Sequence, residues 1–195
     1  MTSSRHKARA HVIAWARQRT GNSKTLFLDT ETTGLGPHAE IIDLAVLDLD
    51  GNALIDTLIA PSICIPAESS RIHGIVDADV QNAPAWSDIY PELAGLIRER
   101  PVVVYNASFD QRMIAACCRV YACEPVSVEW HCAMQQYARY AGERSSHKRN
   151  RFRLHKLGDA VSAFGLPAGT HRAHSDAMAC RNLVLALADL DPESA

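Results

Sequence analysis

Apolar residues recur at helical spacing in several segments of this 195-residue chain. Near the N-terminus, Ala8, Val12, Trp15 and Ala16 follow this spacing, so residues 5–19 are predicted to form a helix that ends close to Gly21. The same criterion predicts helices further along the chain, over residues 86–98, 107–122, 133–141, 155–164 and 173–190.

Short continuous apolar runs predict β-strands over residues 25–29, 41–49, 53–60, 102–105 and 127–130. Asp50-Gly51 separates the second run from the third and is a strong hairpin signal. Residues 62–85 carry several prolines and serines and are predicted to be a connection around a turn at His73-Gly74. Three meandering strands followed by alternating helices and strands predict an α/β fold with a mixed five-stranded sheet flanked by helices.

Composition and length indicate one globular domain, with 47% hydrophobic and 22% charged residues. We expect residues 1–22 to be an N-terminal helical extension, residues 23–190 the main domain and residues 191–195 a short tail. No run approaches the roughly 18 consecutive apolar residues that a membrane helix needs. The N-terminus leads into no apolar signal segment either, so we expect a cytoplasmic protein.

A formal net charge of −2 argues against binding of nucleic acid through a strongly basic surface. Basic residues nevertheless cluster in residues 144–156, at Arg144, Lys148, Arg149, Arg151, Arg153 and Lys156. This segment is either a solvated loop or a contact for phosphate groups. The six cysteines include no Cys-x-x-Cys pair and lie mostly in apolar segments, so we expect reduced core residues.

Asp29 and Glu31 lie two residues apart at the end of the first predicted strand, so their side chains point to the same face. Unpaired carboxylates at this separation repel each other and resist burial, so the pair needs a cation or a shared proton. For an Asp-x-Glu taken alone, the alternative is a strand end whose acidic residues face water.

Two further groups of polar residues lie at the edges of predicted elements. Asn106 and Asp110 follow the strand at residues 102–105, which places Asp110 in the first turn of the next helix. His171 and Asp176 lie at the start of the last apolar helix. Acidic groups at three such edges predict one cluster, and its carboxylate oxygens suit Mg²⁺ and suit zinc poorly.

The three groups together resemble the three motifs of the DEDDh 3′–5′ exonucleases, which include bacterial proofreading subunits, ribonuclease T and oligoribonuclease. The motifs are Asp29-x-Glu31, Asn106-x-x-Phe109-Asp110 and His171-x-x-x-x-Asp176. Their order, their spacing and the Ile-His-Gly-Ile at residues 72–75 agree with the family, over roughly residues 24 to 188. The resemblance implies a ribonuclease H-like fold and hydrolysis of phosphodiester bonds at 3′ ends, with release of nucleoside monophosphates.

The resemblance also implies two divalent cations, Mg²⁺ with Mn²⁺ able to substitute, held by Asp29, Glu31, Asp110 and Asp176. In the family pattern, the position of Asp29 bridges both ions. His171 would be the general base, because imidazole titrates near neutrality. His174 is closer to Asp176 along the chain but does not match the motif, so we assign it no catalytic role.

Contacts to the terminal nucleotide are implied for Thr32, Leu35, His73, Asn106 and Phe109. Leu35 and Phe109 would wedge or stack against the terminal base, and Thr32 would offer its hydroxyl or backbone amide to the terminal sugar. For His73 the alternative is a plain turn residue, and for Phe109 it is a core position.

Residues 130–134, Trp-His-Cys-Ala-Met, are similar to the Trp-x-Cys-x-Met of compact stand-alone bacterial enzymes of the exonuclease X type. This similarity favours a free-standing DNA exonuclease over a subunit tethered to a polymerase. The partners that we expect are single-stranded or frayed 3′ ends of DNA, with RNA as the other candidate, and no membrane. The alternatives are a 3′–5′ exoribonuclease and a non-catalytic module that binds nucleic-acid ends or assists a polymerase. Because all four motif carboxylates and the histidine are present, we expect an active enzyme.

Overall fold

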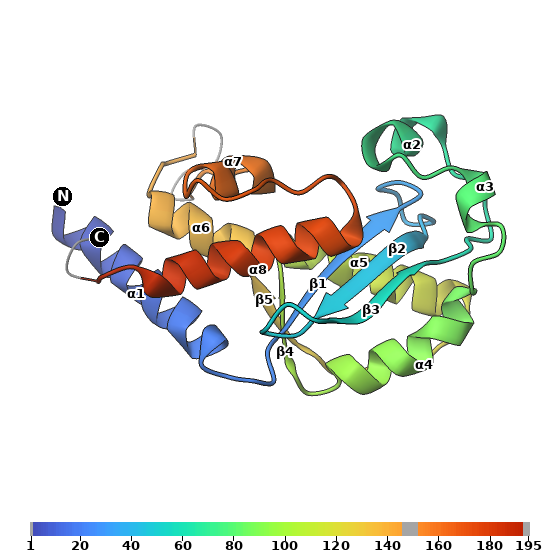
Figure 1. Ribbon diagram of the computed structural model, residues 1–195, viewed down its shortest axis with the longest axis horizontal. Coiled ribbons are helices and arrows are strands. Elements are labelled where there is room, and N and C mark those ends of the chain that lie inside the picture. Colours follow the sequence, from blue (N-terminus) through green and yellow to red (C-terminus); the bar gives the residue numbers. More distant parts are fainter. Residues whose placement is uncertain (1, 146–151, 193–195) are drawn as a thin grey trace.

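Five strands form a mixed sheet in the computed structural model, which describes residues 2–145 and 152–192 (Figure 1). The strands are β1 (Leu26–Thr32), β2 (Ile41–Leu47), β3 (Ala53–Leu58), β4 (Pro101–Val104) and β5 (Glu129–Cys132). Their order is β3-β2-β1-β4-β5, so β1 is the central strand. β2 is antiparallel to β1 and β3, whereas β4 is parallel to β1 and β5. The predicted mixed five-stranded sheet is confirmed.

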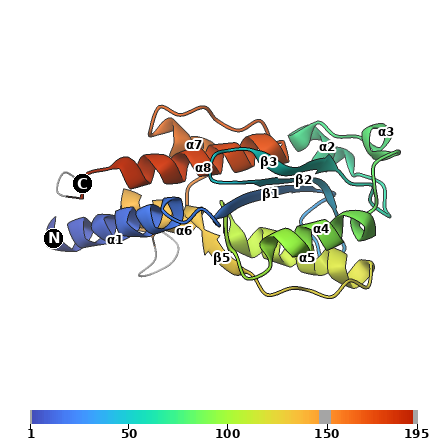
Figure 2. The same cartoon turned by 60° about the horizontal axis from the view of Figure 1, so that its bottom comes forward.

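Helices flank this sheet (Figures 1 and 2). They are α1 (Thr2–Thr20), α2 (Ala67–His73), α3 (Asp77–Val80), α4 (Trp86–Ile97), α5 (Ala107–Val120), α6 (Ala133–Ala141), α7 (Leu157–Ser162) and α8 (Ala173–Asp189). The longer helices agree with the predicted ones to within a few residues. Within the described ranges, no helix combines the length and the apolar character that crossing a membrane requires.

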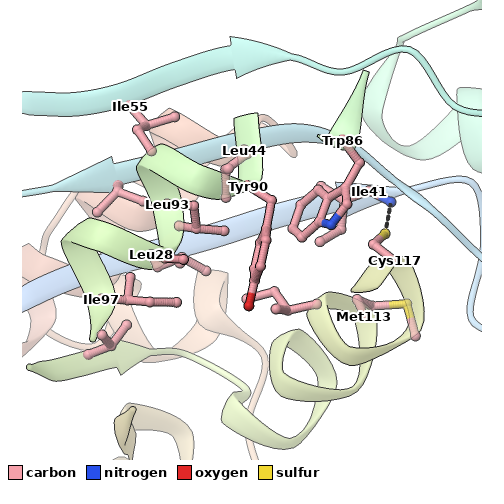
Figure 3. Close-up of a cluster of buried hydrophobic side chains, with 14 of the residues drawn as sticks. Leu28, Ile41, Leu44, Ile55, Trp86, Tyr90, Leu93, Ile97, Met113 and Cys117 are labelled. Carbon is pink, nitrogen blue, oxygen red and sulfur yellow. Dashed lines mark hydrogen bonds between the residues drawn. The ribbon is translucent and has the colours of Figure 1, made fainter. Parts of the chain in front are cut away.

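Separate hydrophobic cores cover the two faces of the sheet. On one face, α4 packs its apolar side, formed by Trp86, Tyr90, Leu93 and Ile97, against strand residues that include Leu28 (Figure 3). On the other face, α8 and α1 pack against strand residues that include Phe27. Because side chains alternate along β1, Asp29 and Glu31 lie on the same face as Phe27, which is the face of α8.

Helix α1 packs on α8 and α6 and buries Val12, Ile13 and Ala16 completely. Arg17 donates hydrogen bonds to the backbone oxygens of Ala188 and Leu190, each at 3.0 Å. These carbonyls belong to the end of α8, where a helix leaves C=O groups without intrahelical partners. Helix α1 therefore caps α8.

The structure differs from the prediction in residues 62–85, where two short helices, α2 and α3, replace an irregular connection. Helix α2 ends at Gly74, whose φ of 77° is the left-handed conformation that favours glycine. Ile65, Ile75 and Val80 pack with Ile42 of β2 in a small cluster. Helices this short are not stable alone, so these contacts with the sheet stabilise them.

All six cysteines are free thiols, as predicted. Cys117, Cys118 and Cys180 are buried, whereas Cys64 is exposed and differs from the expected core position. Burial raises the pKa of the Cys180 thiol well above its usual range, and the carboxylate of Asp29 raises it further. A buried thiol of this kind is protonated and inert.

Candidate active site

Asp29 and Glu31 lie at the C-terminal end of β1, side by side on one face as predicted. Burial raises the pKa of Asp29 well above its usual range, and Asp110, Asp176 and Glu31 raise it further. Burial likewise raises the pKa of Glu31 to about 8, with Asp176 the neighbour that contributes most. The charged forms of these residues therefore repel one another strongly.

Asp110 lies in the first turn of α5, directly after β4, and is buried. Because β4 runs parallel to β1, the start of α5 lies beside the end of β1. Thr30 of β1 donates its hydroxyl to Oδ1 of Asp110 at 2.9 Å. Burial raises the pKa of Asp110 to about 7, and the hydrogen bond from Thr30 opposes this rise. Thr30 thus orients the third carboxylate.

Asp176 lies in the first turn of α8, next to the end of β1. Its Oδ1 accepts a hydrogen bond from the backbone N–H of His171 at 3.2 Å, so the loop before α8 folds back over the helix start. Burial raises the pKa of Asp176, and the charge of His171 opposes the rise. Ligand atoms of Glu31, His171 and Asp176 all lie within 4.8 Å of one another. The first and third motifs therefore converge.

The donor set fits a divalent cation. Carboxylate oxygens from Asp29, Glu31, Asp110 and Asp176 are the ligands that Mg²⁺ and Mn²⁺ prefer. The pKa of each carboxyl group is raised, mainly by burial, which shows that four negative charges here need compensation. A bound divalent cation would supply this compensation.

His171 is exposed beside this cluster, whereas His174 is half-buried in α8. The backbone of His171 is left-handed, with φ of 57°, which is uncommon for a residue other than glycine. A second hydrogen bond, from the N–H of Thr170 to Oγ of Ser175 at 3.1 Å, braces the same loop. His171, and not His174, belongs to the converging set of ligand atoms.

Leu35, Asn106 and Phe109 differ in their accessibility. Leu35 follows β1 and is 78% exposed. Asn106 is exposed at the N-cap of α5, where Oγ of Ser108 donates to its Oδ1 at 3.2 Å. Phe109 is partly buried against the core, with the guanidinium of Arg112 5.4 Å from its ring centre. The first two are open to a ligand, and Phe109 is partly a core residue.

His73 and Thr32 are both buried. Nδ1 of His73 accepts a hydrogen bond from the N–H of Ile75 at 3.1 Å, so the proton of the neutral ring is on Nε2. Burial lowers the pKa of His73 and favours this neutral form. Nε2 is buried and makes no hydrogen bond of good geometry within the described residues, although the nearby backbone of Thr32 opposes the lowering of the pKa. The Thr32 hydroxyl donates to the backbone oxygen of Gly34 at 2.7 Å, which leaves its backbone amide as the expected contact.

The basic segment at residues 144–156 is only partly described, because Lys148, Arg149 and Arg151 lie outside the described residues. Arg153 pairs with Glu143 at 3.1 Å, with both side chains mostly exposed. The guanidinium of Arg144 lies 5.1 Å from the ring centre of Phe152. Contact of this segment with phosphate groups stays a prediction.

A mixed sheet with carboxylates at the end of its central strand, joined by acids from the starts of two helices, is an arrangement of the ribonuclease H-like fold, which the similar solved structures share. The chain belongs to the exonuclease family, because the family model described as Exonuclease matches residues 26–184. The predicted DEDDh-type 3′–5′ exonuclease, acting on nucleic-acid ends, is confirmed.

Relatives match most of the chain. An uncharacterized exonuclease of Escherichia phage 186 is 39% identical over 171 residues, which cover 84% of this chain and 87% of that protein. DNA polymerase III subunit epsilon of Treponema pallidum is 31% identical over 160 residues, covering 80% of this chain and 72% of that protein. The structure of exonuclease X in complex with 5′ overhanging duplex DNA has a TM-score of 0.59 and 22% identity, covering 87% of this chain and 95% of that one.

Sequence reasoning missed Thr30, Asp43 and Gly169. Asp43 does leave a sequence signal, because it is an acidic residue inside an apolar run, and every residue of that strand is buried. Thr30 and Gly169 leave no signal, since the contacts that matter join them to Asp110 and Asp176. Thr30 donates a hydrogen bond to Asp110, Arg172 donates one to Asp43, and the missing side chain of Gly169 leaves room for Asp176.

Gly169→Ala is expected to lower turnover about 100-fold. A Cβ at this position would lie 1.8 Å from Oδ1 of Asp176, so the carboxylate and the His171 loop must move, and a shift of about 1 Å can cost that factor. Gly158→Ala in α7 is the matched control, because its Cβ would meet nothing within 4 Å. Steady-state rates of both variants measure the effect, and equal rates would contradict this role for Gly169.

Proposed function

We propose that this chain is a free-standing, magnesium-dependent exonuclease that releases nucleoside monophosphates from the 3′ ends of DNA. The observation that carries the proposal is the gathering of Asp29, Glu31, Asp110 and Asp176 with His171 at the end of β1. The phage relative, of which the chain covers 87%, is named an exonuclease, and this supports an enzyme that works without a polymerase.

In the proposed site, Asp29, Glu31, Asp110 and Asp176 would hold two Mg²⁺ ions, and Mn²⁺ could substitute. When bound, the ions would lower the pKa of the attacking water and stabilise negative charge on the leaving oxygen. Asp29 would be the ligand shared by the ions, because the three other carboxylates lie close enough to raise its pKa. Thr30 keeps Asp110 oriented toward the same point.

His171 accepts the proton of the attacking water. Its ring is exposed beside Glu31 and Asp176, and a histidine ring nitrogen is the usual general base in enzymes. The backbone N–H of His171 donates a hydrogen bond to Asp176, a proposed metal ligand. This bond fixes the position of the proposed general base relative to that ligand.

The terminal nucleotide is bound by groups around the carboxylates. Leu35 stacks its exposed side chain against the terminal base. Nε2 of His73 is a buried donor that lies near the backbone of Thr32 without a hydrogen bond of good geometry, so an acceptor on a ligand would satisfy it. Asn106, Phe109 and the backbone amide of Thr32 complete the proposed contacts.

DNA is the proposed substrate because two of the similar proteins, DNA polymerase III epsilon and exonuclease X in complex with duplex DNA, are named with DNA. The proposed form of this substrate is a single-stranded or frayed 3′ end. Discrimination against RNA would rest on contacts to the 2′-hydroxyl, so RNA is the other outcome of the test.

Purified protein is expected to shorten 5′-labelled DNA progressively and to release a labelled mononucleotide first from 3′-labelled DNA, only with Mg²⁺ or Mn²⁺. The carboxylates cannot activate water without an ion. Mg²⁺ should also raise the melting temperature, because a ligand of the folded state stabilises it. RNA of the same sequence is the matched substrate. Undiminished hydrolysis after exhaustive chelation would contradict the proposed need for a metal ion. Faster cleavage of RNA than of DNA would contradict DNA as the preferred substrate.

A further inference from the structure

Asp43 is a charged residue in the middle of a buried strand. Every residue of β2 is buried, and Asp43 itself is 2% exposed. It pairs directly with Glu31 in the β1–β2 ladder, so both side chains lie on the face of α8. Like charges at directly opposite positions destabilise a sheet, so Asp43 needs compensating groups.

Those groups come from the start of α8. Nε of Arg172 donates to Oδ2 of Asp43 at 2.7 Å, and the backbone N–H of Ala173 donates to the same oxygen at 3.2 Å. Arg172 is the N-cap residue of α8. The contact joins residues 129 positions apart and attaches the helix start to β2 at two points.

The attachment of Arg172 and Ala173 to Asp43 lies directly beside two of the proposed active-site residues. His171 immediately precedes Arg172, and Asp176 lies one turn into the helix. The backbone of His171, with its left-handed φ of 57°, is bonded to Asp176 on one side and followed by the anchored Arg172 on the other. Without the anchor, the loop could relax from this uncommon conformation and the imidazole would move.

We propose that Asp43 and Arg172 form a positioning pair that sets the orientation of His171 relative to the carboxylates of β1. The inference rests on the proposed role of His171 as general base. Asp43 is buried and its carboxylate is used by α8, so it acts through the loop and not on the substrate. The guanidinium of Arg172, 48% exposed, supplies the charge that lets Asp43 lie opposite Glu31.

Arg172→Met removes the guanidinium and keeps a long side chain. We expect kcat to fall about 10- to 100-fold, as is usual when the partner that orients a functional group is lost, with KM changed less than about threefold. Arg181→Met is the matched control, because Arg181 lies on the same helix and donates to the backbone oxygen of Leu49 at 2.8 Å, beyond the other end of β2. Its kcat should stay near that of the wild type.

The decisive measurement repeats Arg172→Met in a His171→Asn background. If the pair acts through His171, Arg172→Met should lower the kcat of His171→Asn by less than about threefold, because the imidazole that the pair positions is absent. A merely structural role would cost the same factor in both backgrounds, and that result would overturn the proposal.

Folding is controlled with the Asp43→Asn/Arg172→Met double variant, which removes both charges and leaves no lone buried carboxylate. It should melt close to the wild type and lose as much kcat as Arg172→Met alone. Full activity in this variant would also contradict the proposed role of the pair.

A wild type without 3′–5′ activity, or an unimpaired His171→Asn, would contradict both the proposed function and the proposed role of the pair. If His171→Asn is impaired and Arg172→Met lowers kcat by the same factor in both backgrounds, only the proposed role of the pair is contradicted.

Discussion

Asp29→Asn is expected to lower turnover by at least about 10³-fold. Asp29 lies among the other three carboxylates and is the proposed shared ligand, so its loss affects both ions. Bound ions stabilise the transition state by several kcal/mol, and each ~1.4 kcal/mol is a factor of ten. The measurement is kcat at saturating Mg²⁺ and substrate. Activity within about tenfold of the wild type would show that the metal assignment is wrong.

The same substitution is expected to stabilise the metal-free protein at alkaline pH. The pKa values of Asp29 and Glu31 are raised in the folded state, so their contribution to stability is present below about pH 4 and is lost as the pH rises through about 8, the pKa of Glu31. Asparagine removes one of the repelling charges. The difference in melting temperature between variant and wild type should therefore grow from about pH 5 to about pH 8.

Glu92→Gln is the matched control for this comparison, because Glu92 is an exposed acid on α4. Its melting curve should follow that of the wild type at each pH. Mg²⁺ should raise the melting temperature of this control and of the wild type, and should have little effect on Asp29→Asn. A variant that is less stable than the wild type at every pH would contradict the repulsion inferred for Asp29.

His171→Asn is expected to lower kcat about 10²- to 10⁴-fold, the range for loss of a general base, with KM changed little. Asparagine is a better test than alanine, because it tolerates the left-handed backbone that His171 adopts. Folding and the stabilisation by Mg²⁺ should be retained, since the four carboxylates remain. The measurement is kcat and KM on a 5′-labelled DNA strand.

His174→Asn is the matched control, because His174 lies three positions further on and is half-buried. It is expected to retain kcat close to that of the wild type. Equal losses in the two variants, or a larger loss for His174→Asn, would show that the wrong histidine has been assigned as the base.

The longer elements are predictable because burial leaves a repeat in the sequence. The core residues of α4 repeat every three or four positions, and β2 is one continuous apolar run interrupted by Asp43. Helices α2 and α3 have seven and four residues and leave no such repeat. Helix α3 depends on the packing of Val80 against Ile42, and Ser69 of α2 donates a hydrogen bond to the backbone oxygen of Thr33 at 2.8 Å. The local sequence reveals neither contact.

The exposure of the proposed substrate-contacting side chains could likewise not be predicted from the local sequence pattern. Leu35 and Phe109 are both apolar residues next to a motif, yet the first is exposed and the second partly buried. From the sequence, His73 has the pattern of a turn residue. The burial of its Nε2 follows only from the tertiary structure. Burial is a property of the packed chain and not of residue type.

By itself, the sequence determined which residues are the candidates for the chemistry. The alternation of a strand puts Asp29 and Glu31 on one face, and the first turn of a helix holds Asp110 or Asp176 at its start, so both are local effects. Only the tertiary structure decided how these groups are held. Asp43 meets Arg172 across 129 positions, and Gly169 is required because a side chain there would collide with Asp176. Such contacts depend on distances in space, which chain spacing does not encode.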